Sequence, residues 1–211
     1  SKFLEKKYNV IRSDVTKGHE YLDVTNEINV ETFFKEKKID AVVHSAYPRT
    51  ENWGLDFFDV TYELFTKNIS LQLGGAFNIL KHACSHFKKN NGGNIVFIGS
   101  VSGVMNPRFE TYDGLGMTTP VAYSCIKSAL ISLSSYATKY LKDENIRINV
   151  VSPSGIFDNQ SEIFVKRYKQ HCLNKGMLDA SDLNGVVDFL LSNNSKYING
   201  QNIIIDDGFT L

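Results

Sequence analysis

Residues 120–130 read P-V-A-Y-S-C-I-K-S-A-L, and the interpretation of the whole chain starts from this stretch. Tyr123 and Lys127 are four residues apart, so on a helix their side chains would share one face. A phenol has a pKa near 10, and an ammonium group beside it favours the phenolate and lowers that pKa. Ser100, at the end of the apolar run N-I-V-F-I-G-S, could hold a substrate oxygen against the phenol. These three residues are therefore candidates for exchanging a proton with a carbinol or a carbonyl.

Chance alone supplies about one Tyr-x-x-x-Lys pair in a chain of this composition, so the pair needs support from the rest of the sequence. That support comes from apolar runs that alternate with helical patterns along the chain. Strands that are apolar on both faces and alternate with helices predict an α/β fold with a Rossmann-like, doubly wound parallel sheet. The expected strands are 8–13, a short one ending at Asp23, 39–46, 94–99, 146–152 and 202–205, and the expected helices are 30–37, 62–89, 121–142, 161–174 and 181–191, the last capped by Ser181.

Length and composition favour a single domain over residues 1–211, with 42% hydrophobic and 22% charged residues. The formal net charge of +0 gives no indication of a nucleic-acid or membrane partner. No apolar run approaches the roughly 18 residues of a membrane span, and the charged start S-K-F-L-E-K-K is no signal peptide. Three scattered cysteines fit a reduced, cytoplasmic setting. His82 and His86 have a spacing that two metal ligands could use, but no third ligand is evident, so no metal is expected.

Several motifs resemble, in order along the chain, those of the short-chain dehydrogenase/reductase family. L-D-V-T at 22–25 is similar to the family's adenine-contacting Asp-Val pair, and H-S-A-Y at 44–47 takes the place of Asn-Asn-Ala-Gly. G-S-V-S-G at 99–103 resembles the serine motif, and N-V-V-S-P-S-G-I at 149–156 the Pro-Gly motif. N-G-Q-N-I-I-I-D-D-G at 199–208 resembles the last strand. Ordered motifs at plausible spacing are a stronger signal than any one of them alone.

The resemblance implies an enzyme that moves a hydride between a nicotinamide cofactor and a carbinol carbon. Tyr123 would be the acid and base, Lys127 would lower its pKa and hold the nicotinamide ribose, and Ser100 would orient the substrate oxygen. Asp14 would hold the adenosine ribose hydroxyls and repel a 2′-phosphate, so NAD is expected in preference to NADP. The residues implied for cofactor binding are Asp14, Asp23, Val24, Ser45, Ala46, Tyr123, Lys127, Pro153 and Ile156.

The front of the chain departs from the family pattern. The family opens with a strand and a T-G-x-x-x-G-x-G loop that cradles the pyrophosphate, and no such loop occurs here. Residues 1–7 resemble the last turns of the helix that follows this loop. The missing strand would lie within the sheet, between the strands at 8–13 and 39–46. We therefore expect a domain that is incomplete at its N-terminus, with roughly 30 residues preceding Ser1.

Two smaller departures concern the site itself. Gln72 stands where the motif N-x-x-G-x-F has its asparagine, and Asn68 lies one helical turn earlier. Either amide could hold the water of a proton relay, so both remain candidates. Ser154 replaces the first glycine of the Pro-Gly motif.

The segment between Ser100 and Tyr123 is longer than usual for the family, and Arg108 and Tyr112 within it are expected to line the substrate mouth. Across the cleft, Tyr47, Arg49 and Trp53 could stack on and bind a sugar or its phosphate. With G-I-F-D-N-Q at 155–160 and the D-D-G-F ending, this loop resembles the bacterial subgroup associated with flagellin modification and surface-sugar biosynthesis. A sugar, polyol or nucleotide-sugar substrate is the resulting expectation.

Two other hypotheses share the fold. The chain could be a non-catalytic dinucleotide-binding sensor or scaffold, or a structural subunit whose partner supplies the missing strand; the retained Ser-Tyr-Lys trio favours an enzyme. The family resemblance also implies a homodimer or homotetramer formed through the helices at 62–89 and 121–142. Apolar positions that could serve this contact, or simply the core, are Leu71, Phe77, Leu130 and Leu133.

Overall fold

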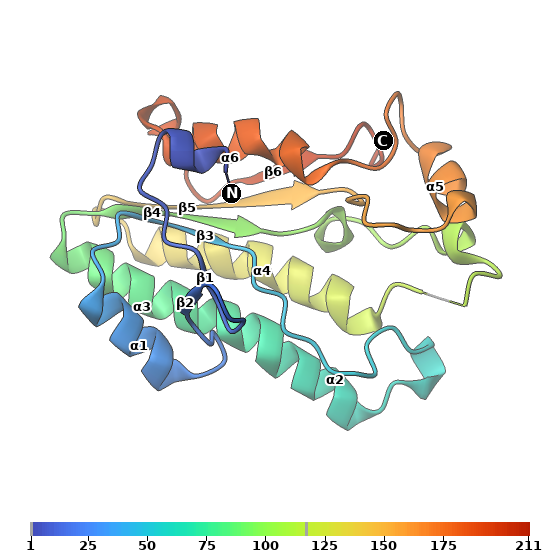
Figure 1. Cartoon of the computed structure of the whole chain (residues 1–211), viewed down its shortest axis with the longest axis horizontal. Helices are drawn as coiled ribbons and strands as arrows, with labels where there is room; N and C mark the ends of the chain where they lie inside the picture. Colours follow the sequence, from blue (N-terminus) through green and yellow to red (C-terminus); the bar gives the residue numbers. More distant parts are fainter. Residues whose placement is uncertain (1, 117) are drawn as a thin grey trace.

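The computed structural model describes residues 2–116 and 118–211. Ser1 lies outside the described residues, and so does Met117, which belongs to the expected substrate loop. One parallel sheet is covered on one face by three long helices and on the other by a shorter one (Figure 1). This arrangement confirms the predicted α/β class. The sheet order is β3 (Ala41–His44), β4 (Gly93–Ile98), β5 (Ile146–Pro153) and β6 (Asn202–Ile205); α1 (Glu27–Glu36), α3 (Gly75–Lys89) and α4 (Val121–Tyr140) cover one face, and α6 (Asn184–Leu191) the other.

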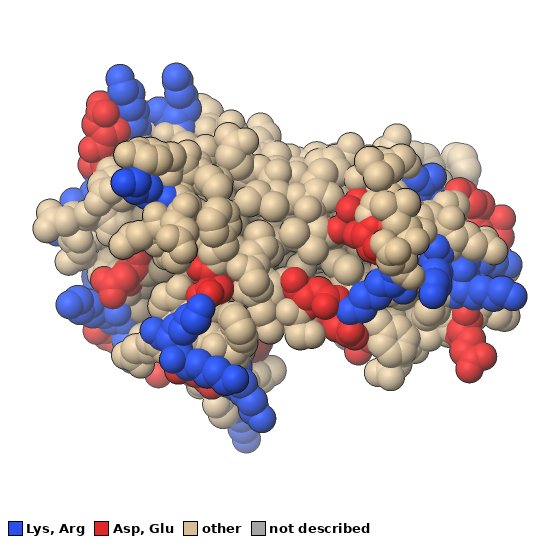
Figure 2. Space-filling model, turned by 90° about the horizontal axis from the view of Figure 1, so that it is seen from above, with Lys and Arg blue, Asp and Glu red and all other residues tan. Residues whose placement is uncertain are grey.

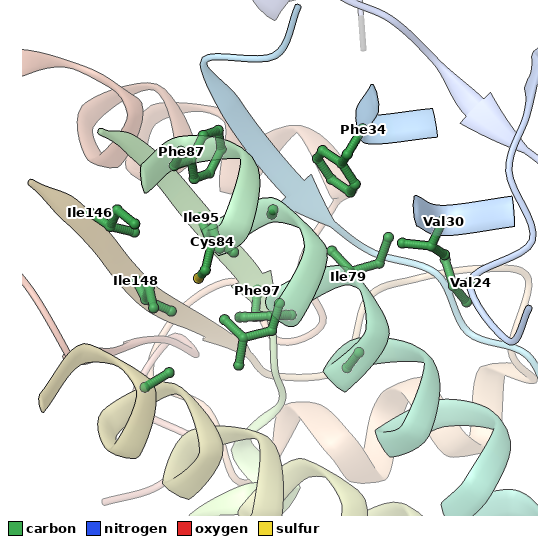
Figure 3. Packing of buried hydrophobic residues seen from close by; sticks show 14 of the residues in the cluster. Val24, Val30, Phe34, Ile79, Cys84, Phe87, Ile95, Phe97, Ile146 and Ile148 are labelled. Atoms are coloured by element: carbon green, nitrogen blue, oxygen red, sulfur yellow. The ribbon is translucent and has the colours of Figure 1, made fainter. Parts of the chain in front are cut away.

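The core lies on both sides of the two central strands, which are buried along most of their length. Ile95 and Phe97 of β4 point to α3, where Phe87 and Ile79 are also buried (Figure 3). Val96 belongs to a second apolar cluster, under α6. Each such large side chain stabilises the fold by roughly 1.5–3 kcal/mol relative to exposure, so this two-sided core holds the strands and the ends that carry the site.

The helix from Tyr62 to Lys89 has the predicted extent but contains a π-helical turn. α2 (Tyr62–Ile69) continues through this turn at Ser70–Gly74 into α3. The sequence does not predict the turn. Asn68 and Gln72, on or beside it, are both buried. π-helical turns of this kind are frequent at functional sites.

Three predicted helix boundaries need correction. α1 begins at Glu27 because Asn26 caps it by accepting a hydrogen bond from the Asn29 N–H. α5 (Glu162–Lys169) is shorter than the predicted helix at 161–174. Ser181 does not cap α6; instead a capping box of Asp179 and Asp182 opens a 3₁₀ turn that leads into it.

The predicted strand at 8–13 is wrong. Strand β1 comprises only Ser13–Asp14 and pairs with β2 (Glu20–Tyr21) in a small sheet of its own. Ile11 is 40% exposed, because no neighbouring strand covers it. Within residues 2–116 and 118–211, β3 pairs with β4 alone, so its other edge is open. The two sheets are thus separate at the place where the sequence predicts a strand that this chain lacks.

The remaining segments are short. A 3₁₀ turn at Leu4–Lys6 lies near α6, where Lys7 and Tyr8 both bind the Asp188 carboxylate (Figure 1). On the face seen from the α6 side, Lys and Arg lie close to Asp and Glu toward both ends, and most of the surface between them is uncharged (Figure 2). Among the described residues, no helix has the length and apolar character needed to cross a membrane.

Candidate active site

The candidate residues gather where the parallel strands end. Ser45 and Ala46 follow β3, Ser100 follows β4, and Pro153 ends β5. Tyr123 lies in the first turn of α4, beside these strand ends. The carboxyl ends of the strands face the side of the molecule where α5 and the C-terminus lie (Figure 1). Open α/β sheets bind their ligands at this edge.

The predicted trio comes together there. Ser100 is buried, and its Oγ accepts a hydrogen bond from the Ser102 N–H at 3.1 Å. The Lys127 Nζ lies 5.4 Å from the centre of the Tyr123 ring and donates to the Ile98 carbonyl at 2.9 Å. Gly103 lets the serine loop meet α4, since a Cβ there would lie 2.8 Å from the Lys127 carbonyl oxygen. The trio therefore spans two elements that are in direct contact.

Burial dominates the electrostatics of the pair. It raises the pKa of Tyr123, an effect that the Ser100 hydroxyl partly offsets and Tyr112 increases. Burial also lowers the pKa of Lys127 from 10.5 to about 8. The expectation that Lys127 lowers the pKa of Tyr123 is wrong for this arrangement. The ammonium group lies over the ring and is bonded to Ile98, so desolvation of the phenol is the larger effect.

His44 is a functional candidate that the sequence did not single out. It stands in the first position of the altered Asn-Asn-Ala-Gly motif, is buried, and contacts Phe97 edge-on at 5.5 Å. Burial, and then the charge of Lys127, lower its pKa to about 4, so the imidazole is neutral at pH 7. A neutral imidazole therefore lies close enough to Lys127 for the charge of the lysine to affect it. The only sequence signal was the replacement of asparagine by a titratable residue.

The adenosine side of the expected cofactor site is formed by the small sheet. The Asp14 carboxylate is exposed at the end of β1 and accepts a hydrogen bond from the Thr16 N–H at 3.0 Å. A carboxylate has about four acceptor positions, so this one retains capacity for ribose hydroxyls. Asp23 accepts from the Thr25 N–H and Oγ1 and so fixes its own turn. Val24 is buried against Gly75.

The nicotinamide side is formed by the segment after β5. The Gly155 N–H donates to the Tyr168 hydroxyl at 2.6 Å, and the Ile156 carbonyl accepts from Gln160 at 3.2 Å. Neither bond uses the Ile156 N–H, which suits the amide contact implied by the family resemblance. The residues present thus fit the two ends of a dinucleotide. For its pyrophosphate, the described part of the chain contains no glycine-rich loop.

The structure separates the two tetrad candidates. Asn68 uses its amide to hold Thr50 and the Leu64 carbonyl, with contacts of 2.9 to 3.1 Å. The Gln72 Nε2 is buried and has no hydrogen-bond partner among the described residues. A buried unpaired amide is costly unless something binds it, so Gln72 is the better candidate for a relay water.

The expected substrate residues have different surroundings. Arg49 lies over the Tyr47 ring at 5.8 Å. Tyr112 accepts from the Thr119 hydroxyl at 2.8 Å and is close enough to Tyr123 to raise its pKa. Arg108, in contrast, donates to the carbonyls of Phe209 and Leu211 and lies over the Phe209 ring at 5.3 Å. Arg108 therefore holds the C-terminal segment, and its contact with a substrate stays a prediction.

Comparisons with known proteins identify the family. A family model described as enoyl-(acyl carrier protein) reductase matches residues 2–210. Post-translational flagellin modification protein A of Campylobacter coli is 38% identical over 196 residues, which cover 90% of this chain and 77% of that protein. The 3-oxoacyl-[acyl-carrier-protein] reductase MabA of Mycobacterium bovis is 30% identical over 71% of this chain and 58% of its own length.

Among solved structures, a short-chain dehydrogenase from Leptospira borgpetersenii serovar Hardjo-bovis with bound NAD+ superimposes with a TM-score of 0.82 and 31% identity. The match covers 90% of this chain and 74% of that one.

Proposed function

The chain belongs to the short-chain dehydrogenase/reductase family of NAD(P)-dependent oxidoreductases, and we propose that it interconverts a carbinol and a carbonyl on a sugar, polyol or nucleotide-sugar. The proposal rests on one observation: Ser100, Tyr123 and Lys127 meet at the carboxyl edge of the sheet. A role in flagellin modification or surface-glycan biosynthesis is supported by the similarity to the Campylobacter protein. We place the enzyme in the cytoplasm, in keeping with its three free thiols.

In this proposal the nicotinamide, when bound, accepts or supplies the hydride. The Ser100 hydroxyl donates to the substrate oxygen, and the Tyr123 Oη takes the carbinol proton or returns it to the carbonyl. Lys127 holds the nicotinamide ribose. Gln72 holds the water that links the lysine to solvent. Each residue thus performs binding or proton transfer, and the redox chemistry belongs to the cofactor.

NAD is the proposed cofactor because the exposed Asp14 carboxylate would repel a 2′-phosphate. Asp23 and Val24 would form the adenine contact, Ser45 and Ala46 would border the adenosine ribose, and Pro153 and Ile156 would border the nicotinamide. We further propose that a strand on the open edge of β3 completes the domain and brings the pyrophosphate loop with it.

The experiment is a dehydrogenase screen with NAD and with NADP against phosphorylated and nucleotide-linked sugars, on wild type and Tyr123→Phe. Turnover should fall by roughly 10²- to 10⁴-fold in the variant, the contribution of a general acid and base. NAD binding, followed by calorimetry, should be retained. Tyr140→Phe, at an exposed position on the same helix, is the matched control. Full turnover in Tyr123→Phe would favour the sensor hypothesis. Absence of turnover in the wild-type protein would favour it as well.

A further inference from the structure

We propose that Tyr47 and Trp53, here called the aromatic wall, position the catalytic Tyr123 and stack on the ring of an anionic sugar whose negative group binds Arg49. This proposal deepens the proposed function and depends on it for the reaction at the sugar. It names a substrate class and three residues outside the catalytic trio.

The wall is built around the catalytic ring. Tyr47 meets Tyr123 edge to face, with ring centres 5.7 Å apart and planes at 88°. Trp53 meets both rings in the same way, at 5.7 Å from Tyr47 and 6.3 Å from Tyr123. Edge-to-face contact at such distances is the favourable geometry for aromatic pairs. The orientation of the Tyr123 ring therefore depends on two side chains from a different segment.

The same wall also faces outward. Tyr47 remains 38% exposed in spite of its contacts, and Trp53 is partly exposed. Aromatic surface that borders a catalytic group and still meets solvent is typical of ligand sites. The C–H face of a sugar ring is apolar, so it can cover such a surface while its hydroxyls reach the polar groups of Ser100 and Tyr112.

The segment that carries the wall is fixed to α2 by one buried side chain. The Asn68 Oδ1 accepts from the Thr50 N–H at 3.1 Å, and its Nδ2 donates to the Thr50 hydroxyl at 3.0 Å. Asn68 is 4% exposed, so these bonds are shielded from water. Thr50 lies midway between Tyr47 and Trp53 in the chain, and Asn68 is therefore a positioning residue for both rings.

The positive charge of Arg49 beside the wall favours a sugar that carries a negative group. The Lys127 Nζ lies 5.8 Å from the Tyr47 ring centre, and the Arg49 guanidinium also lies 5.8 Å from it. Arg49 is exposed and forms no salt bridge with an acidic side chain in the described part of the chain. A guanidinium binds carboxylates and phosphates through paired hydrogen bonds. A sugar that carries either group would use the wall and Arg49 together, whereas a neutral polyol would use the wall alone.

Binding can be measured directly, because Trp53 is the only tryptophan among the 211 residues. Its fluorescence should change on titration with glucose, glucuronate and glucose 6-phosphate, and the two anions should bind about tenfold more tightly than glucose. Comparison of the two anions distinguishes a carboxylate from a phosphate. Arg49→Gln should bring both down to the level of glucose. Arg12→Gln, which removes an exposed arginine paired with Glu5, should change nothing.

Positioning is tested by kinetics on a substrate found in the screen. Tyr47→Phe keeps the ring and should retain kcat within about twofold, whereas Tyr47→Leu should lower kcat by roughly 10- to 100-fold with less effect on KM. Asn68→Asp retains an acceptor for the Thr50 N–H but loses the donor to the Thr50 hydroxyl. Its kcat should lie between those of Tyr47→Phe and Tyr47→Leu. Phe58→Leu is the control, at a 91% exposed aromatic in the same connection. Circular dichroism verifies that each variant is folded.

The outcomes separate the two proposals. Equal kcat for Tyr47→Phe and Tyr47→Leu would overturn the proposed role of the aromatic wall, and so would a Trp53 fluorescence signal that no sugar changes. In either case, turnover of a sugar by the wild-type protein would still support the proposed function. A saturable Trp53 response in a protein that oxidises none of the sugars would uphold the wall as a binding site and defeat the proposed function.

Discussion

The Lys127 ammonium group is partly buried and lies close to the rings of Tyr47 and Tyr123. Burial lowers its pKa from an ordinary 10.5 to about 8, because removing the ammonium group from water disfavours its charged form. The hydrogen bond to Ile98 offsets only part of this cost. Catalytic groups are often held at such an expense to stability.

Lys127→Met should therefore stabilise the cofactor-free protein while removing its activity. The folded pKa lies below the unfolded one, so the charged lysine destabilises the fold fully below pH 8, and this effect is lost as the pH rises toward 10.5. Urea denaturation should show a gain on the order of 1–2 kcal/mol at pH 7 that shrinks by pH 10. Lys139→Met, on the same helix, is the matched control. A variant less stable than wild type at pH 7 would contradict this account.

Ser100→Ala should move to higher pH the limb of the pH–rate profile on which alcohol oxidation becomes faster as the pH rises. The Ser100 hydroxyl lowers the pKa of the Tyr123 phenol, so its loss leaves a base that deprotonates later. The measurement is kcat/KM against pH, with Ser102→Ala as the neighbouring control. An unshifted limb in the Ser100 variant would show that this serine only orients substrate.

At this scale the sequence was informative where a motif fixed both residue type and spacing. Ser100, Tyr123 and Lys127 meet as predicted, since strand ends and helix faces determine their directions. It could not separate Asn68 from Gln72, because both occur at helical spacing and only their partners differ. It also could not show that Arg108 holds the C-terminal segment, because nothing local indicates that the backbone oxygens of Phe209 and Leu211 lie beside it.

At the scale of elements, the segment that follows β6 holds the region around α5. The Asp207 carboxylate accepts three backbone N–H bonds, from Asn174, Lys175 and Gly176. Phe209 stacks on Tyr168 at 4.4 Å, and Tyr168 in turn holds Gly155. The end of the chain thereby fixes the segment that precedes Ile156.

Asp207→Asn should make the protein less sensitive to acid. Backbone hydrogen bonds lower the pKa of Asp207 below its ordinary 3.8, so the carboxylate stabilises the fold above about pH 4 and loses that effect as the pH falls through its folded pKa. Thermal denaturation should show a lower Tm for the variant at pH 7 and a smaller difference near pH 3. Asp40→Asn, at an exposed site, is the control. A constant difference across this pH range would exclude the ionised contact as the cause.

The presence and type of most elements were predictable from periodicity, but several of their first and last residues were not. β6 and the extent of 62–89 agree with the structure, because long apolar patterns determine them. The π-helical turn at 70–74 leaves no mark in a pattern of apolar residues, and it places Gln72 in the core. The strand at 8–13 failed for another reason: its apolar residues are suited to a sheet, but no described strand pairs with them.

At the scale of the molecule, an apolar groove runs between the π-helical turn with α3 and the facing side of α4. It is lined by Ile69, Ser70, Leu73, Gly74, Phe77, Ala129, Ser132, Leu133 and Tyr136. Phe77 is 50% exposed and Tyr136 70%. Leu130, named from sequence beside Leu133, is buried in the core instead. We propose that a second copy of the chain covers this groove.

Leu133→Glu should then lower the oligomeric state, since each copy would bring a carboxylate into the apolar contact. Light scattering at micromolar concentration should show a dimer or tetramer for wild type and a monomer for the variant. Leu173→Glu, at a 68% exposed leucine away from the groove, should leave the assembly intact. A monomeric wild type would refute the proposed assembly.

The bare margin of β3 has a consequence for handling this protein. Ala41–His44 contains neither proline nor lysine, two residues that prevent intermolecular pairing at the edge strands of natural sheets. Wherever no further strand covers this edge, its unpaired amides and carbonyls can pair with extended peptide from other molecules, and fibrous precipitates of stacked strands are the expected hazard in concentrated solution.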